Sequence, residues 1–215
     1  MSATAAGLAL VGSAALVFGI TAQHHAPTPP ASAALPTTRP ASGSADAPSS
    51  TTASTGPVLG ASVPTVLDIP ALGVHHDLIT LGHKTDGTVE VPPLSDVAVP
   101  GWDRFSPTPG ELGPAVILGH VDAATQGRGV FYSLGALRPG DTVSITRTDH
   151  SVAVFRVDGV DEYSKDTFPT LTVYGNTPDP QLRLITCGGP YDPETHNYLS
   201  NIVAFATLVD SHPAT

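Results

Sequence analysis

The single cysteine of the chain, Cys187, is the first residue that suggests chemistry. It follows the apolar run 182–186 and precedes Gly188-Gly189-Pro190. A thiol at the end of a strand that opens into a glycine-rich turn can be reached by the backbone of a substrate, and its thiolate is a strong nucleophile. The alternative is a small buried residue without chemistry. In either case, one cysteine excludes an internal disulfide and a zinc site built from several thiolates.

A cysteine nucleophile needs a proton-transfer partner, which is usually histidine. The chain has 9 histidines. We favour His120, because it ends the buried-looking run 115–119 at the mouth of a predicted strand, where site residues often lie. His196, in a predicted loop after Cys187, is the alternative. We assign no chemistry to the others, which are His24, His25, His75, His76, His83, His150 and His212.

The elements that must position these side chains lie in residues 63–210, a length typical of one domain with its own core. Short β-branched segments separated by turn residues predict eight strands, at 63–69, 76–80, 87–91, 115–120, 142–147, 152–157, 182–187 and 202–209. Residues 131–137 and 169–174 predict short helices or helical turns. Because no helical pattern is long enough for parallel α/β crossovers, we predict an all-β fold, a closed or nearly closed eight-stranded β-barrel.

Residues 1–62 differ in composition from the predicted domain. Residues 3–22 form an uncharged apolar run that as a helix would span about 30 Å, the thickness of the hydrocarbon core of a bilayer. Segment 1–22 therefore predicts a transmembrane anchor, with a cleaved secretory signal as the alternative. Residues 23–62 are rich in Pro, Ala, Ser and Thr, which predicts a disordered linker with a reach of up to about 100 Å. A short disordered tail is predicted for 211–215.

Charge excludes several kinds of partner. The chain of 215 residues has 9 Lys+Arg and 19 Asp+Glu, a formal net charge of −10. Binding to nucleic acid or to anionic lipid needs clustered Lys and Arg, which this sequence lacks. Nothing in the sequence indicates a metal or an organic cofactor.

Several motifs together resemble those of the sortases, the exported cysteine transpeptidases of Gram-positive bacteria. They are Leu118-Gly119-His120 and Leu184-Ile185-Thr186-Cys187, each at the end of a predicted strand. The Thr-Cys-Gly-Gly continuation, the stretch Val116-Ile117-Leu118-Gly119-His120-Val121-Asp122 and Pro100-Gly101-Trp102 are most similar to the class F sortases of actinobacteria. The resemblance covers essentially all of 63–209, and it implies a distorted eight-stranded barrel with a Cys-His-Arg site.

The resemblance also implies an activity. A C-terminal sorting signal of Leu-Pro-x-Thr-Gly (LPxTG) type would be cleaved between Thr and Gly, with a thioacyl intermediate on Cys187 and His120 as the general acid and base. The acyl group would pass to an amine of a cell-wall precursor. The implied partners are surface proteins that carry the signal, and the implied location is the cell membrane, with a single membrane pass and an extracytoplasmic catalytic domain.

The arginine departs from the family pattern. Sortases generally carry it on the last strand, where this chain has the uncharged residues 199–201, and no Arg or Lys follows Arg183. Arg183 shares a strand face with Cys187, about 13 Å away along the strand. We predict that Arg183 binds the substrate carbonyl oxygen, with Arg104 and the amide of Asn201 as alternatives. Asp122, two residues after His120, could orient the imidazole.

Two other functions stay open at this point. The same thiol chemistry with water as acceptor would make the protein a cysteine endopeptidase. A non-catalytic secreted β-barrel that binds peptide or wall polymer, with Cys187 as a structural residue, is the alternative outside enzymes.

Overall fold

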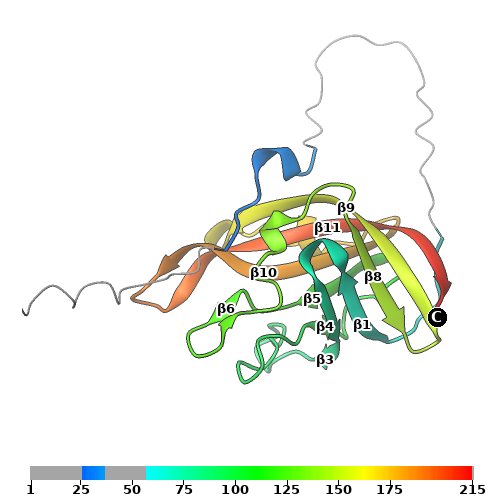
Figure 1. The fold of residues 1–215 in the computed structure, drawn as a ribbon, viewed down its shortest axis with the longest axis horizontal. Helices are drawn as coiled ribbons and strands as arrows, with labels where there is room; N and C mark the ends of the chain where they lie inside the picture. The colour runs from blue at the N-terminus through cyan, green and yellow to red at the C-terminus, as the bar shows by residue number, and fades with distance from the viewer. Residues whose placement is uncertain (1–25, 37–56, 215) are drawn as a thin grey trace, which may run out of the picture.

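The computed structural model describes residues 26–36 and 57–214. Nine strands form one sheet in the order β2-β1-β8-β9-β11-β10-β5-β4-β3, and β6 pairs with β7 beside it (Figure 1). The strands of the large sheet are β1 (Pro64–Ile69), β2 (Val74–Asp77), β3 (Ile79–Leu81), β4 (Gly101–Asp103), β5 (Gly113–Leu118), β8 (Thr142–Arg147), β9 (Ser151–Ser164), β10 (Pro180–Asp192) and β11 (Asn197–Pro213). The short pair is β6 (Asp122–Ala123) and β7 (Gly127–Arg128).

Helices are few and short. They are η1 (Ala31–Ala33), η2 (Pro70–Leu72), η3 (Leu134–Ala136), η4 (Lys165–Thr167) and α1 (Thr170–Tyr174). The predicted all-β class, with a nearly closed barrel-like sheet and few helices, is confirmed. The large sheet has nine strands where eight were expected. Segment 76–80 divides between β2 and β3 and residues 101–103 add β4, whereas 87–91 forms only an isolated bridge between His83 and Val89.

The two faces of the sheet bury different side chains, as the alternation along each strand requires. The main core lies on the inner face and includes Leu182, Leu184 and Ile202. A second cluster, here called the outer cluster, covers the opposite face. Its buried members are Val116, Val173, Ile185, Val203 and Phe205. The outer cluster is important for function because Cys187 lies two residues beyond Ile185 on the same face.

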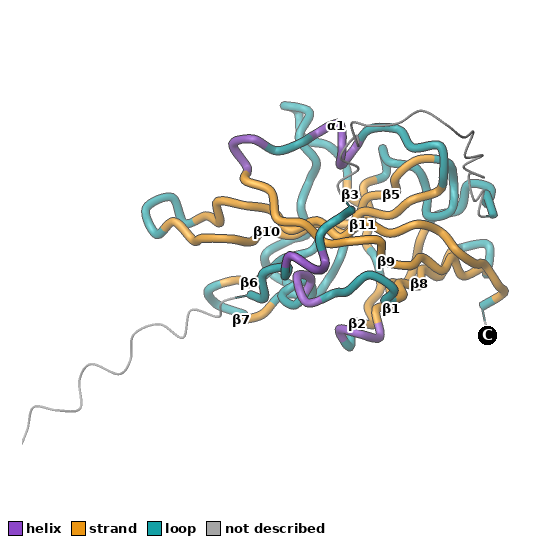
Figure 2. The backbone as a smooth tube through the Cα atoms, turned by 90° about the horizontal axis from the view of Figure 1, so that it is seen from above, coloured by secondary structure: helices purple, strands orange, loops and turns teal. Residues whose placement is uncertain are grey.

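Three strands are longer than the sequence predicts, because turn residues are absorbed into them. A tight turn at 148–150 joins β8 to β9 as a hairpin, with His150 at φ 63°. β10 continues through Gly188 and Gly189 as a bulge, at which the register to β11 shifts. Gly189 has φ 71°, a conformation that favours glycine. The β10–β11 hairpin consequently extends well beyond the rest of the sheet (Figure 2).

At its other end β11 runs to Pro213, so residues 211–213 are strand where a disordered tail was expected.

Part of the predicted linker is ordered. Residues 26–36 lie against the domain, and the side chain of Ala33 is 0% exposed (Figure 1). The backbone N–H of Leu35 donates to Asp161 Oδ2 at 3.3 Å, and the Leu35 side chain packs against the outer cluster. Gly159 allows this close approach, because a Cβ there would lie 3.0 Å from the Ala33 carbonyl oxygen. The prediction of a disordered linker is therefore wrong for residues 26–36.

The domain also begins earlier than predicted. The N–H of Leu59 donates to Gly110 O at 2.8 Å, and Leu59 packs against the main core. No helix in ranges 26–36 and 57–214 is both long and apolar enough to cross a membrane. The predicted transmembrane segment, 3–22, lies outside the described residues.

Candidate active site

Parallel pairing of β5 with β10 brings the predicted nucleophile and its predicted partner to one place. The last register pair is Leu118 with Ile185, and the N–H of Gly119 donates to Ile185 O at 3.1 Å. His120 and Cys187 each lie two residues further along. Cys187 is still within β10, on the face of the outer cluster, and His120 follows the end of β5, whose neighbour β10 lies about 4.8 Å away in the sheet. Both side chains are half-buried.

The row of side chains continues across two more strands. Cys187 pairs in register with Asn201 on β11, and Asn201 pairs with Tyr163 on β9. Opposite residues of an antiparallel pair have Cβ atoms about 4.5–5.5 Å apart. Asn201, an alternative to the expected arginine, is therefore next to the thiol.

A lysine that the sequence analysis missed lies beside the sulfur. Lys165 Nζ is 3.6 Å from Cys187 Sγ and donates a 2.8 Å hydrogen bond to Asn197 Oδ1. A hint was present in the sequence, because Lys165 is the only cation between Arg156 and Arg183. To connect Lys165 with the site one must know that β9 lies next to β11, and local sequence patterns do not show this.

The imidazole of His120 is oriented by a backbone carbonyl. His120 Nε2 lies 2.7 Å from Pro92 O. Because a carbonyl oxygen can only accept, Nε2 carries a proton, and in the neutral ring this leaves Nδ1 as the acceptor. The buried Pro92 belongs to the long loop between β3 and β4. A carboxylate was predicted in this orienting role.

That carboxylate, Asp122, instead binds Tyr198. The Tyr198 hydroxyl donates to Asp122 Oδ2 at 2.6 Å and joins the segment after His120 to β11 beyond Cys187. Burial, followed by the hydrogen bond to Asp122 and the charge of that carboxylate, raises the pKa of Tyr198 above its usual value. The Tyr191 ring packs edge-on against Tyr198, with centroids 5.2 Å apart. These contacts connect the segment that follows His120 with the part of β11 that lies beyond Cys187.

Loss of the Tyr198 hydroxyl should loosen this connection. For Tyr198→Phe we expect the free energy of unfolding to fall by about 1–2 kcal/mol, because the variant removes one hydrogen bond to a charged acceptor and keeps the ring. Urea denaturation measures this. Tyr191→Phe is the matched control, since the Tyr191 hydroxyl has only a 3.3 Å contact with His196 at the exposed hairpin. Equal stability of the two variants would contradict the expected role of the Tyr198–Asp122 bond.

Arg183 lies on the same face as Cys187, but its guanidinium binds protein groups. The side chain is only 3% exposed and stacks on the Phe205 ring, 4.5 Å from its centroid. Nε donates to Val173 O at 3.1 Å, Nη1 to Leu182 O at 3.1 Å and Nη2 to Gln181 Oε1 at 2.6 Å. Burial lowers the pKa of Arg183 to about 10. These contacts connect α1 to β10, and contact with a substrate would require Arg183 to give some of them up.

Two other predicted candidates lie elsewhere. Arg104 is exposed after β4, with its guanidinium 5.0 Å from the Phe105 ring centroid. Trp102, from the motif Pro100-Gly101-Trp102, is in the main core and donates from Nε1 to Pro107 O at 3.1 Å.

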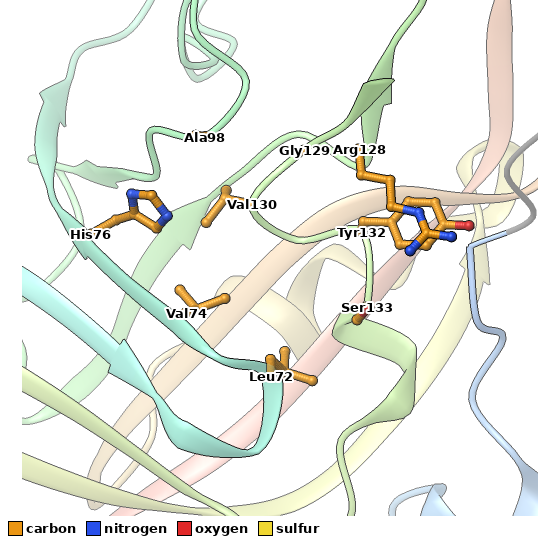
Figure 3. A pocket seen from close by; sticks show the side chains of 9 residues that line it. All are labelled: Leu72, Val74, His76, Ala98, Arg128, Gly129, Val130, Tyr132 and Ser133. Atoms are coloured by element: carbon orange, nitrogen blue, oxygen red, sulfur yellow. The ribbon is translucent and has the colours of Figure 1, made fainter. Parts of the chain in front are cut away.

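The described residues also form a pocket away from the cysteine. It lies between β2 and the segment after β7, and its lining includes Val74, His76, Arg128 and Tyr132 but neither Cys187 nor His120 (Figure 3). Within ranges 26–36 and 57–214, no group of three or more His, Cys, Asp or Glu side chains could hold a metal ion.

Comparisons with known proteins identify the family and the fold. Residues 67–209 match the family model described as "Sortase domain". No curated protein sequence shows significant similarity to the chain. Among solved structures, a sortase A from Listeria monocytogenes has a TM-score of 0.53 at 18% identity, over 73% of this chain and 92% of that one.

Two further structures have similar scores. A lid mutant of sortase A from Corynebacterium diphtheriae has a TM-score of 0.52 at 20% identity, over 71% of this chain and 73% of that one. Sortase C of Streptococcus pneumoniae has a TM-score of 0.51 at 19% identity, over 70% of this chain and 67% of that one. At these identities the likeness shows the fold.

Proposed function

This chain belongs to the sortase family of cysteine transpeptidases, and from that premise we propose that it cleaves a sorting signal of LPxTG type and transfers the acyl part to an amine of a cell-wall precursor. The observation that carries the proposal is the parallel pairing of β5 with β10, whose last register pair, Leu118 with Ile185, lies two residues before His120 and Cys187. The residues on the row beside them, Asn201 and Tyr163, are polar.

The proposed reaction has two steps of the same kind. Cys187 Sγ bonds to the threonine carbonyl carbon, the bond from that carbon to the glycine nitrogen breaks, and the thiol proton passes through His120 to the leaving amine. The acceptor amine then bonds to the same carbon, the C–S bond breaks, and the proton lost by the amine returns through His120 to the sulfur. A thioester intermediate divides one difficult amide exchange into two easier steps, each with proton transfer.

The test is mass spectrometry of the protein incubated with an LPxTG peptide. We expect an added mass on Cys187 equal to the peptide up to its threonine, and a ligated product when an amine such as triglycine is added. Hydrolysed peptide at the same rate with and without the amine would instead identify a cysteine endopeptidase. If no acyl-enzyme forms with LPxTG peptides of varied third residue, the proposed reaction is wrong and a binding module is favoured.

We propose the sortase class and the membrane anchoring from the sequence alone. The motifs around His120, Cys187 and Trp102 support membership of class F, as found in actinobacteria. The apolar run 3–22 supports a membrane-anchored protein with an extracytoplasmic catalytic domain. Recovery of the full chain in the soluble fraction of its native host, with no N-terminal cleavage, would exclude the anchor. The substrate contact predicted for Arg183 stays a prediction.

A further inference from the structure

Lys165 is held next to the nucleophile by regular structure. The last register pair between β9 and β11 is Ser164 with Ser200. Ser164 then caps η4, its hydroxyl oxygen accepting from the N–H of Asp166 at 3.3 Å. From this fixed backbone the half-buried Lys165 side chain reaches both Asn197 at the start of β11 and Cys187 on β10. Secondary structure thus fixes the three backbone segments that carry these contacts.

The positive charge of Lys165 is not neutralised by a carboxylate in the described part of the chain. The ion pairs there are His75 with Asp68, His83 with Asp103 and Arg147 with Asp149. The described partners of Lys165 Nζ are an amide oxygen and a sulfur. Among the lysines and arginines of the described ranges only Arg147 has an ion pair, so Lys165 is distinguished by its contact with the sulfur and not by the lack of a carboxylate.

We infer that Lys165 is a catalytic residue, which stabilises the Cys187 thiolate in the free enzyme and the oxyanion during acyl transfer. The inference deepens the proposed function and rests on it. When the substrate carbonyl carbon bonds to Sγ, the carbonyl oxygen gains negative charge two bonds from the sulfur. A donor 3.6 Å from that sulfur can approach the oxygen to the distance of about 2.7–3.1 Å that such stabilisation needs.

Lys165 Nζ has enough hydrogens to donate to a substrate oxygen in addition to its contacts within the protein. An ammonium group has three hydrogens to donate. The contacts found in the described residues use one on Asn197 and direct one toward the sulfur, which leaves a third for a substrate oxygen. Arg183, by comparison, is only 3% exposed and uses three of its five N–H groups on protein oxygens.

Replacement of the ammonium tests the inference. For Lys165→Met we expect acylation of Cys187 by an LPxTG peptide to slow by about 10²–10³-fold, the effect of removing one oxyanion donor. Alkylation of Cys187 by iodoacetamide at neutral pH should also slow, because the variant removes the cation that lies beside the sulfur. Lys165→Arg should keep more of both rates than Lys165→Met. Lys84→Met is the matched control, because Lys84 is exposed in the loop after β3, and both of its rates should equal those of the wild type.

The outcomes separate this inference from the proposed function. If Lys165→Met reacts with peptide and with iodoacetamide at wild-type rates, while Cys187→Ala is inactive, the role of Lys165 is wrong and the proposed function stands. If the wild type does not react with the peptide, the proposed function fails, and unchanged alkylation in Lys165→Met then also overturns the inference. If Lys165→Met does not fold, Asn197→Ala removes the 2.8 Å partner of Nζ. A smaller loss of both rates in that variant supports the inference, and no loss overturns it.

Discussion

Cys187→Ala is expected to abolish formation of the acyl-enzyme and of ligated product, a fall on the order of 10⁴-fold or more. The physical reason is that Cys187 is the only thiol in the chain, so no other side chain can form the thioester. The measurement is the mass-spectrometric assay with an LPxTG peptide and triglycine.

The variant should otherwise leave the molecule intact. Cys187 is small and half-buried, so we expect its replacement to change the free energy of unfolding by less than about 1 kcal/mol. Thermal unfolding of the two proteins checks this. Retention of ligation by a folded Cys187→Ala variant would remove the thioester from the mechanism.

His120→Gln should lower kcat/KM for transpeptidation by about 10²–10⁴-fold, the usual contribution of a general acid and base. Glutamine is chosen because its amide can still donate to Pro92 O, which keeps the loop contact while it removes the proton transfer. The expected loss therefore reports on chemistry and not on the loop between β3 and β4. Steady-state kinetics with the same peptide and amine provide the measurement.

His196 supplies the control for this prediction. It was the alternative partner of the cysteine, and it lies exposed in the β10–β11 turn with φ 52°. Asparagine tolerates that backbone conformation, so His196→Asn should fold normally and retain wild-type kcat/KM. Activity lost in His196→Asn and kept in His120→Gln would reverse the assignment of the proton-transfer residue.

Local patterns were sufficient for the fold class, and they led to the proposal of Cys187 and His120 as the two central residues of the candidate site. Alternation along 182–187 predicts that Cys187, Ile185 and Arg183 share a face, and the structure has them so. The ends of two apolar runs predict where Cys187 and His120 lie, because a buried strand must become polar where it leaves the core. Both segments lie within residues 67–209, which match the family model.

Other features depend on contacts between segments distant in sequence, and local patterns could not predict them. The proximity of Lys165 to Cys187 follows from the order β9-β11-β10, which no short window contains. Gly188-Gly189-Pro190 suggests a turn, but the partner strand β11 holds these residues in a bulge. The order of residues 26–36 arises from small side chains that fit against Gly159, although their composition is typical of disorder.

The docking of residues 26–36 changes how far the catalytic domain of the proposed enzyme can lie from the membrane. Leu35 packs against the outer cluster and Leu59 against the main core, so parts of the predicted linker 23–62 belong to the domain. The reach of about 100 Å expected of a fully extended linker counts these residues as free, and each docked residue takes about 3 Å from it. For the proposed membrane-anchored enzyme, the catalytic site would therefore lie closer to the lipid surface than the composition of 23–62 predicts.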